Sequence, residues 1–510
     1  MTPTQKTQVV IVGAGPSGLS MASQLLRYGI DFILIEKNEK TTHLSKAVVI
    51  QARTLEIFQE QGLAQKAIER GRQANAFNMF YKGKKKATLD LTGMGNGLSA
   101  FPFALSLEQS KTEKLLVEHL AENGKSVVWK SEFLRYEENN GITVFYKDAH
   151  GEEQQIQAQY LVGSDGASSP IRHQMDVHFE GDTIPKIFYV ADVDLSSPII
   201  NKDQLFVFLI QKGFVLFFPM EGQNHYRVIG ILPDKTEDDE FTFEDIQDSI
   251  KKDIVIPIQF NELKWFSSYK VHSRKADAFQ KGNCFIIGDA AHIHTPAGGQ
   301  GMNTGIQDAY NLAWKLAYKI NYNVNQNVVE SYNSERTENA KRLLNTTDRM
   351  FDFLTGTNVF WNFLRLHIFP YFMRFVSKSP SLNKFFFPLL SQIGIAYPNS
   401  SLTIPGKLGK VKSGDRMPYF VFSDSKTIYD YIGIPAFKIL FFGTEDNADY
   451  SRLHNLKFKV ETLAFDQCPK KNFGAATNFY VLLRPDNHIS YIGNDFESCL
   501  ALLQQIAKGS

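Results

Sequence analysis

A glycine-rich turn between two apolar strands is the feature that most constrains how this chain can fold. The stretch Gly13-Ala14-Gly15-Pro16-Ser17-Gly18 follows the β-branched run 8–12, and residues 19–28 have the apolar spacing of a helix. Residues 32–35 then form a second buried-type strand that ends at Glu36. The order strand, turn, helix, strand predicts a Rossmann-type parallel sheet that begins near residue 8.

The residue types in this turn suit a dinucleotide. The first glycine permits a tight turn, the second lets a pyrophosphate approach the backbone, and the third lets the helix pack against the strand. A carboxylate at the end of the second strand can accept hydrogen bonds from ribose hydroxyls, and it disfavours a 2′-phosphorylated nucleotide. The turn does not separate NAD from FAD. The residues predicted to bind the dinucleotide are Gly13, Gly15, Pro16, Ser17, Gly18 and Glu36.

Two later stretches narrow the choice of cofactor. Asp165-Gly166, within residues 161–172, reads by itself as a turn after a strand. The stretch 284–303 is more specific, because a buried strand delivers Asp289, whose carboxylate can hold a hydroxyl of a polyol such as ribityl. The glycines at 298, 299 and 301 expose backbone amides at the start of a helix over 305–318, where they can stabilise negative charge on a reduced flavin.

With these stretches in order, the chain resembles the class A flavoprotein monooxygenases, the family of the phenol and para-hydroxybenzoate hydroxylases. The resemblance covers roughly residues 8–345. It implies an enzyme with non-covalent FAD that uses NADPH or NADH and O₂ to hydroxylate an aromatic or polyketide-like substrate through a C4a-hydroperoxyflavin. The flavin carries the chemistry, so no catalytic side chain is assigned.

The resemblance also assigns positions along the cofactor. Gly13, Gly15, Gly18 and Glu36 would hold the ADP half, while Arg53 and Gln109 would lie along the cofactor. Asp165 and Gly166 match the motif associated with FAD and the nicotinamide donor. Lys46 stands where many relatives carry Arg, and because Lys lacks the bidentate fork a flavin contact there stays open. The residues expected at the ribityl, pyrophosphate or isoalloxazine regions are Asp289, Ala290, Pro296, Gly299, Gly301, Met302 and Asn303.

The segment 176–275 changes to short aromatic and β-branched runs, which predict an inserted antiparallel sheet. The substrate pocket is expected between this sheet and the flavin ring. Phe206, Phe208 and Phe217 are candidate walls, although ordinary sheet core is the favoured interpretation of each. His292 and His294 are interpreted as structural, since no carboxylate or cysteine cluster accompanies them to make a metal site.

The predicted fold class is therefore α/β, in three parts. Residues 1–175 and 276–395 form a discontinuous Rossmann-type FAD-binding domain, and residues 176–275 form an interleaved mixed or antiparallel sheet domain for substrate. Residues 396–510 resemble the thioredoxin-like extension of the phenol-hydroxylase branch. This part has no CxxC, so it is expected to be structural or to mediate oligomer contacts.

Composition restricts the partners. Fifty-five basic and 54 acidic residues give no global attraction for nucleic acid, and the lysine-rich run 82–86 is interpreted as a solvated turn. Three cysteines and a polar start without a signal peptide suit the cytoplasm. The aromatic-rich segment 350–397 lacks the ~18 consecutive apolar residues of a spanning helix. It is expected to pack on the main body or across a homodimer interface, with membrane-surface contact as the alternative.

The expected partners are thus a small aromatic substrate, O₂ and NAD(P)H. Two other functions stay open at this point. One is an FAD oxidoreductase of another type, which epoxidises, dehydrogenates or modifies an antibiotic; the Trp-x-Trp-x-Ile-Pro of halogenases is absent from the sequence. The other is a flavin-binding protein without turnover.

Overall fold

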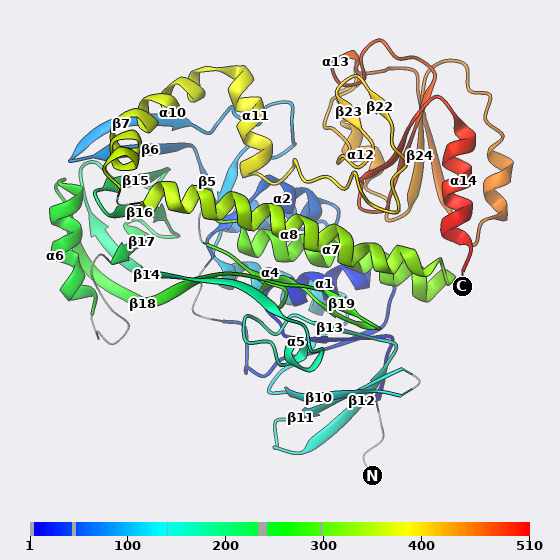
Figure 1. Ribbon diagram of the computed structural model, residues 1–510, viewed down its shortest axis with the longest axis horizontal. Coiled ribbons are helices and arrows are strands. Elements are labelled where there is room, and N and C mark those ends of the chain that lie inside the picture. Colours follow the sequence, from blue (N-terminus) through cyan, green and yellow to red (C-terminus); the bar gives the residue numbers. More distant parts are fainter. Residues whose placement is uncertain are drawn as a thin grey trace.

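The computed structural model describes residues 5–42, 47–139, 141–232, 242–295, 298–356 and 358–509. Lys46 and Pro296, both expected beside the cofactor, lie outside these residues. A central six-stranded sheet, an eight-stranded sheet beside it and a separate C-terminal sheet make up the body of the molecule, and a long helix runs across its middle (Figure 1).

The six-stranded sheet carries the glycine turn. Its order is β19-β20-β13-β2-β3-β9, and the pairs from β20 to β9 are all parallel. The central strands are buried on both faces, because apolar residues of helices α1, α4 and α7 share one core with them. The strands are β2 (Val9–Val12), β3 (Phe32–Ile35), β9 (Val127–Val128), β13 (Tyr160–Gly163), β19 (Gln280–Lys281) and β20 (Cys284–Ile286).

The eight-stranded sheet has the order β21-β18-β14-β17-β16-β15-β6-β7. It includes residues 76–90 and 292–293. These strands belong to the two segments of the expected FAD-binding domain, residues 1–175 and 276–395. They join this sheet because β15 pairs in parallel with β6, and β18 pairs with β21 next to the flavin motif. The strands are β6 (Ala76–Tyr81), β7 (Lys84–Asp90), β14 (Phe179–Ser196), β15 (Gln204–Ile210), β16 (Gly213–Pro219), β17 (His225–Leu232), β18 (Gln259–Ala276) and β21 (His292–Ile293).

Smaller sheets complete the N-terminal three quarters of the chain. One has the order β1-β12-β11-β10 and the other β4-β8-β5. The strands are β1 (Gln5–Lys6), β4 (Val49–Ile50), β5 (Arg72–Ala74), β8 (Ala104–Ser106), β10 (Glu132–Glu138), β11 (Ile142–Lys147) and β12 (Glu153–Ala158).

Helices join and cover these sheets. None of the helices in the described ranges is long and apolar enough to cross a membrane. The bounds are α1 (Pro16–Arg27), α2 (Ala52–Gln59), α3 (Ala64–Arg70), α4 (Gln109–Glu122), α5 (Pro170–Gln174), α6 (Phe243–Ile254), the 3₁₀ turn η1 (Gly288–Ala290), α7 (Gly301–Tyr322), α8 (Gln326–Thr355), α9 (Val359–Phe363), the π-helical turn η2 (Leu364–Ile368), α10 (Phe369–Lys378) and α11 (Pro380–Leu390).

The C-terminal part has its own four-stranded sheet, of order β25-β24-β26-β27, in which only β24 and β25 are parallel. Its thioredoxin-like character stays a prediction, as do the domain boundaries, whereas the α/β class with an interleaved mixed sheet is confirmed. The elements are β22 (Lys407–Leu408), β23 (Val411–Lys412), α12 (Ile428–Ile432), β24 (Phe437–Phe442), η3 (Tyr450–Asn455), β25 (Val460–Phe465), α13 (Lys470–Phe473), β26 (Phe479–Leu483), β27 (Ile489–Gly493) and α14 (Phe496–Ala507).

Candidate flavin site

The glycine turn lies between β2 and α1, and each glycine has a different neighbourhood. Gly13 has φ +100°, a left-handed conformation that favours glycine. A Cβ on Gly18 would stand 1.9 Å from the Gly13 carbonyl oxygen, so only glycine lets α1 approach the strand so closely. Among the described residues, no heavy atom would lie within 4 Å of a Cβ on Gly15. The second glycine therefore borders open space at the helix N-terminus, where a pyrophosphate would lie.

The glycine turn also contacts the Gly-Asp motif, residues 288–303, which begins with Gly288 and Asp289. A Cβ on Gly288 would stand 2.3 Å from the Ser17 hydroxyl oxygen, and one on Gly305 would stand 2.2 Å from it. Ser17 thus occupies the narrow space where η1 and α7 approach α1. Gly288 belongs to the stretch that the sequence singled out, whereas Gly305 lies beyond it.

Glu36 follows β3 directly and is 8% exposed. Its Oε2 accepts a 2.7 Å hydrogen bond from the Ala14 N–H, and its Oε1 accepts one from the Asn38 N–H at 2.9 Å. The carboxylate therefore holds the glycine turn itself. A carboxylate oxygen accepts more than one hydrogen bond, so capacity for a ribose hydroxyl is left.

The Asp-Gly motif packs against the glycine turn. The Ser164 hydroxyl donates to the carbonyls of Val12 and Gly13, at 2.8 and 2.7 Å. Asp165 Oδ2 accepts from the Ile171 N–H, and burial raises the pKa of the Asp165 carboxyl. Gly166 has φ +84° and turns the chain toward α5. The motif is thereby fixed next to the first glycine.

Arg172, at the end of the same motif, reaches the Gly-Asp motif. Its Nη1 donates to the Ala290 carbonyl at 2.9 Å and its Nη2 to the Ala167 carbonyl at 2.8 Å. Its guanidinium also lies 3.9 Å from the centre of the Phe179 ring. One buried arginine therefore joins two of the three segments that the sequence singled out, and packs against the first residue of β14.

Asp289 differs from its neighbours, because Gly288 and Ala290 are buried whereas Asp289 is exposed. The motif is fixed from behind by Asp308 on α7, whose Oδ2 accepts from the Gly288 N–H at 3.0 Å. The η1 turn thus presents a carboxylate outward from a buried backbone. This orientation fits the predicted contact with the ribityl or pyrophosphate part of FAD.

Asp308 is the centre of a buried charge cluster. Its Oδ2 also lies 2.7 Å from His292 Nε2, and its Oδ1 accepts from Arg336 Nε at 2.6 Å. Burial alone would raise the Asp308 pKa, but Arg336 and His292 lower it. Arg336 Nη2 donates in addition to the Thr304 carbonyl. These charges, to which the sequence assigned no role, hold η1 and the first turns of α7 together. No local pattern predicts their pairing, because Asp308 and Arg336 lie on different helices.

The loop before α7 is tied to the segment before α2 by Asn303. The Asn303 Oδ1 accepts from the Gln51 N–H at 2.9 Å and from the Thr54 hydroxyl at 2.8 Å. Its Nδ2 donates to the carbonyls of Val49 and Gly299, at 2.8 and 3.0 Å. The side chain of Asn303 therefore shapes the loop. Its neighbours Gly301 and Met302 are half-buried, at the helix start.

Several buried polar atoms of the Gly-Asp and Asp-Gly motifs have no hydrogen-bond partner among the described residues. They include His294 Nε2, Thr295 Oγ1 and Asp165 Oδ1. Because His294 Nδ1 lies 2.7 Å from the Thr295 carbonyl, which can only accept, Nδ1 carries the proton. Burial lowers the pKa of His294 to about 4, so the ring is neutral and its Nε2 is an acceptor. Unpartnered buried groups beside open backbone amides fit a bound polar cofactor.

Arg53 and Gln109, which were predicted to lie along the cofactor, make hydrogen bonds with other protein groups. The Arg53 guanidinium is 2% exposed, and it donates to Glu56 Oε2 at 3.0 Å and to the Asp486 carbonyl at 3.2 Å. Arg53, which is part of α2, therefore connects this helix to the C-terminal domain. Gln109 begins α4, and its Nε2 donates to Glu113 Oε1 at 2.9 Å. Contacts of these side chains along the cofactor stay a prediction.

The three candidate wall residues share one face of the eight-stranded sheet. Phe206, Phe208 and Phe217 are at most 2% exposed and belong to the apolar cluster that includes Phe243 and Ile250 of α6. Side chains alternate along a strand, so Val207 and Leu209 face the other side, where residues of α8 and η2 pack. The three rings are therefore part of the core beneath α6.

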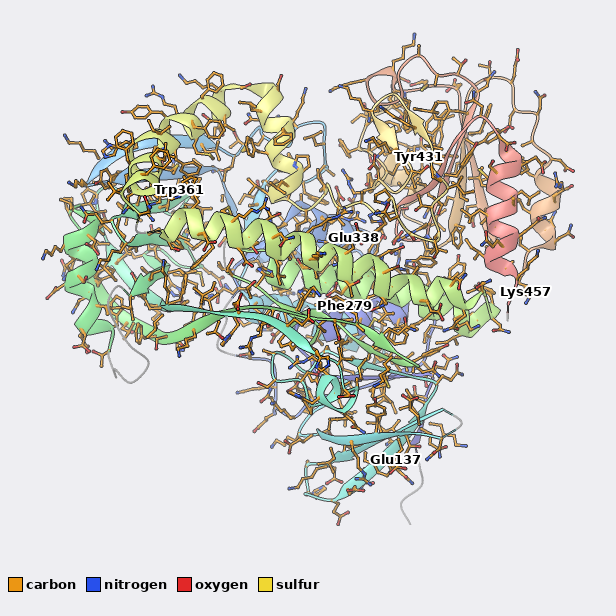
Figure 2. All side chains as sticks on the ribbon, viewed as in Figure 1. Glu137, Phe279, Glu338, Trp361, Tyr431 and Lys457 are labelled. Atoms are coloured by element: carbon orange, nitrogen blue, oxygen red, sulfur yellow. The ribbon has the colours of Figure 1, made fainter. Side chains whose placement is uncertain are left out.

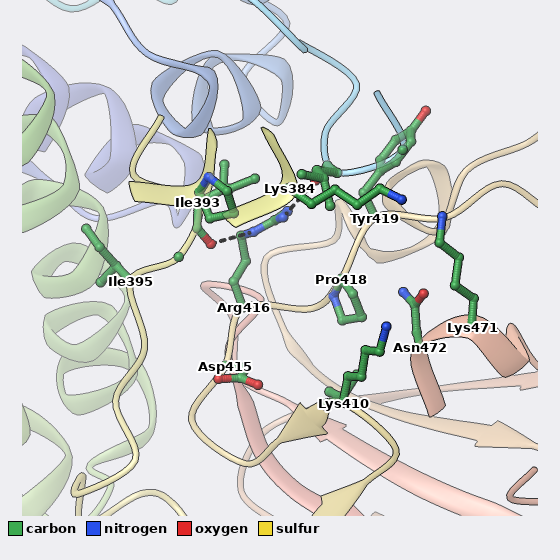
Figure 3. A pocket seen from close by; sticks show the side chains of 15 residues that line it. Lys384, Ile393, Ile395, Lys410, Asp415, Arg416, Pro418, Tyr419, Lys471 and Asn472 are labelled. Carbon is green, nitrogen blue, oxygen red and sulfur yellow. Dashed lines mark hydrogen bonds between the residues drawn. The ribbon is translucent and has the colours of Figure 1, made fainter. Parts of the chain in front are cut away.

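A cavity of about 370 Å³ lies between α11 and the C-terminal domain (Figure 3). Lys384, Lys410 and Lys471 line it together with Tyr419. Arg416 forms part of its wall, and donates to Glu56 Oε1 at 3.1 Å. None of the predicted cofactor residues is among the residues that line this cavity, so it is separate from the glycine turn.

Comparison with known proteins identifies the fold around these motifs. A family model described as an FAD binding domain matches residues 6–347, about two thirds of the chain. The chain belongs to this FAD-binding family. The predictions of an FAD cofactor and of a flavoprotein monooxygenase are thereby confirmed, together with the resemblance on which they were based.

Relatives in this family have named activities. The chain is 29% identical over 492 residues to an uncharacterized aromatic compound monooxygenase of Bacillus subtilis (strain 168), covering 95% of this chain and 94% of that protein. It is 33% identical over 341 residues to 6-methylpretetramide 4-monooxygenase of Streptomyces rimosus, which covers 67% of this chain and 61% of that protein. The flavin-dependent monooxygenase PieE, solved with FAD and substrate, has the same fold, with a TM-score of 0.83 at 20% identity over 99% of both chains.

Proposed function

We propose that this FAD-dependent monooxygenase hydroxylates an electron-rich aromatic ring, including fused rings of polyketide type, and that NADPH or NADH supplies the electrons. The observation that carries the proposal is that three distant segments pack together: Ser17 of the glycine turn lies against Gly288 and Gly305, and Ser164 bonds the carbonyls at the start of that turn. The relatives named for an aromatic compound and for 6-methylpretetramide support the substrate class.

The side chains and amides around this site have separable tasks. Bound FAD supplies the transfer of one oxygen atom from O₂ to the substrate. Gly15 leaves room for the pyrophosphate, and Asp289 accepts hydrogen bonds from hydroxyls of the cofactor. The amides at the N-terminus of α7 favour negative charge on the flavin ring, since the helix dipole adds to them. Neutral His294 offers Nε2 as an acceptor at the same loop.

The substrate is proposed to lie where the sheet meets the flavin loop. Strand β18 pairs with β21, which places Arg274 opposite Ile293. The Arg274 Nη2 donates to the Thr183 hydroxyl at 3.0 Å, and that hydroxyl lies 2.8 Å from His272 Nδ1. A cation beside a hydroxyl and an imidazole can orient a phenolate oxygen. Arg274 and His272 are therefore proposed as the polar wall of the substrate site.

Oxygen consumption tests the proposal. NADPH and NADH oxidation would be followed with an oxygen electrode across phenols and polycyclic aromatic compounds, with ¹⁸O₂ and mass spectrometry of the product. The expected result is faster NAD(P)H oxidation with a phenolic ring and one ¹⁸O atom in the product. If no ring compound accelerates oxidation and no oxygenated product forms, the hydroxylase proposal is wrong.

The variant Gly15→Ala tests the cofactor geometry separately. Gly15 has φ −71° and ψ −179°, which alanine adopts, and the added methyl group would have no atom of the residues that the structure describes within 4 Å. The fold should therefore be retained while FAD affinity falls about tenfold or more, as expected when a methyl group displaces a backbone–phosphate contact. Gly93→Ala is the matched control, because its nearest neighbour would be Asn96 Nδ2 at 3.7 Å. Equal FAD affinity of the two variants would contradict the predicted site.

Cytoplasmic location and a homodimer are retained as proposals. The small number of cysteines supports a cytoplasmic location. The names of the relatives give no oligomeric state. Size-exclusion chromatography with light scattering would decide the oligomeric state.

A further inference from the structure

The helices α9 to α11 expose an unusual concentration of apolar side chains. Ten of the 16 large hydrophobic residues that are exposed in the described part of the chain lie between Val359 and Leu389. Seven of the ten are aromatic, and no phenylalanine, tyrosine or tryptophan elsewhere in the described residues is as exposed. An apolar surface this concentrated marks an interaction site rather than scattered surface residues.

Individual exposures show that these rings are not simply the rim of a core. Phe385 is 70% exposed, Phe375 65% and Phe360 62%. Trp361 is 49% exposed and lies at the outer end of the helical layer, far from the C-terminal domain (Figure 2). The opposite sides of η2, α10 and α11 are packed, since Leu366, Val376 and Phe387 are buried. These three elements therefore have one side in the core and one side in solvent, whereas α9 has no buried residue.

The segment that carries these rings contains basic but no acidic side chains. Residues 353–414 contain no aspartate or glutamate. Arg374 and Lys378 on α10 are exposed. The basic hairpin that joins β6 and β7 lies at the same edge, because the Tyr81 ring stands 5.6 Å from the His367 ring of η2 in an edge-to-face arrangement. Lys84 and Lys85 in that hairpin are exposed.

We propose that these exposed rings and cations form one face that binds the surface of a lipid membrane containing anionic headgroups. The face is defined by Phe360, Trp361, Tyr371, Phe372, Phe375 and Phe385 together with Lys84, Lys85, Arg374 and Lys378. Aromatic and aliphatic side chains enter the boundary between headgroups and acyl chains, and the cations contact anionic headgroups. Helices of this kind lie in the membrane surface and do not span it.

The charge pattern favours a membrane over a second copy of the chain. In a two-fold symmetric dimer the same surface patch meets itself, so the cations of both copies would be brought together without acidic residues from the same segment to compensate them. An anionic lipid surface supplies both the opposite charge and an apolar phase. The lysine-rich run 82–86, which the sequence analysis interpreted as a solvated turn, is part of this surface.

Vesicle sedimentation of the full chain with bound FAD tests the inference. We expect binding to phosphatidylcholine vesicles with 30% phosphatidylglycerol, at least about tenfold weaker binding to pure phosphatidylcholine, and loss of binding in high salt, because headgroup attraction is screened. Trp361 provides a second signal. Its emission should shift to the blue on binding, and Trp361→Phe should remove the shift, whereas Trp129→Phe should retain it.

Matched variants separate the apolar and charged contributions. The triple variant Phe360→Ser, Phe375→Ser and Phe385→Ser should lose at least about tenfold in vesicle affinity, because it removes three rings from the membrane boundary. The control triple Leu134→Ser, Leu263→Ser and Val421→Ser changes exposed residues elsewhere and should bind as wild type.

Charge reversal completes the design. Lys84→Glu with Lys378→Glu should weaken binding to anionic vesicles by about fivefold or more for each changed residue, whereas Lys37→Glu with Lys457→Glu should not. Wild-type protein that fails to sediment with anionic vesicles overturns the inference. The inference is also overturned if the wild type is a dimer that does not bind vesicles and the serine triple variant is a monomer. The face would then bind a second copy of the chain.

Discussion

Asparagine in place of Asp308 is expected to destabilise the protein strongly. The Asp308 carboxylate is 0% exposed and accepts from the Gly288 N–H, from Arg336 Nε and, at 2.7 Å, meets His292 Nε2. Asp308→Asn keeps the shape and removes the charge, which leaves the buried Arg336 guanidinium without its counterion. Removing one partner of a buried ion pair costs about 3–5 kcal/mol. We therefore expect a loss of about that size in the free energy of unfolding.

Urea unfolding at a fixed excess of FAD measures the loss, with Asp248→Asn as control. The Asp248 side chain is 86% exposed, so its change should stay within about 0.5 kcal/mol. Arg336→Met and the double variant complete a cycle, in which the two substitutions should couple by about 1 kcal/mol or more. If Asp308→Asn lowers the free energy of unfolding by less than about 1 kcal/mol, the ion pair between Asp308 and Arg336 does not hold the flavin motif in place.

The same substitution has a defined pH dependence. Arg336 and His292 lower the folded-state pKa of Asp308 against the effect of burial. A lowered pKa stabilises the folded state fully above the ordinary carboxyl pKa of about 4, and this stabilisation is lost as the pH falls below it. The difference between wild type and Asp308→Asn should therefore be constant from pH 6 to 8 and shrink at lower pH.

Three further outcomes are expected. Asp289→Ala should lose bound FAD, measured by flavin absorbance, while its melting temperature without added FAD stays near wild type, because the carboxylate is exposed. Glu335→Gln should lower the melting temperature clearly in a thermal scan: burial acts to raise the Glu335 pKa, but Arg484 and Lys315 bring it down to about 2. Cys284 should resist iodoacetamide at pH 8 in peptide mass spectrometry, since burial raises its pKa to about 12.

The sequence predicted the cofactor motifs because their chemistry is local. Gly13, Gly15 and Gly18 lie where one strand passes into one helix, so spacing alone places them, and the pairing of β13 with β2 brings Ser164 to Gly13 and Gly18. The charged residues behind the motif were not predicted. Asp308 and Arg336 come from different helices, and no local pattern says which buried charges will meet.

The sheet shows a different limit. Alternation in β15 predicts two faces, with Phe206 and Phe208 on one and Val207 and Leu209 on the other. It does not say which face α6 will cover, because that depends on the connection through residues 242–258. The pairing of β15 with β6, 128 residues earlier in the chain at Gln204 and Ala76, depends in the same way on tertiary structure.

The buried charges of α8 explain why the C-terminal domain belongs with the flavin site. Arg336 contacts Asp308 behind the flavin motif, and its Nη1 donates to the Tyr397 hydroxyl at 2.9 Å. Its neighbour Glu335 accepts from Arg484 Nη1 at 2.6 Å and from Lys315 Nζ at 2.8 Å. Without the C-terminal domain, Glu335 would lose its ion pair with Arg484. A buried charge that loses its partner lowers the free energy of unfolding, and the loss grows with each missing partner. Because Glu335 and Arg336 are consecutive on one helix, the contact with the C-terminal part and the contact that holds Gly288 through Asp308 lie side by side.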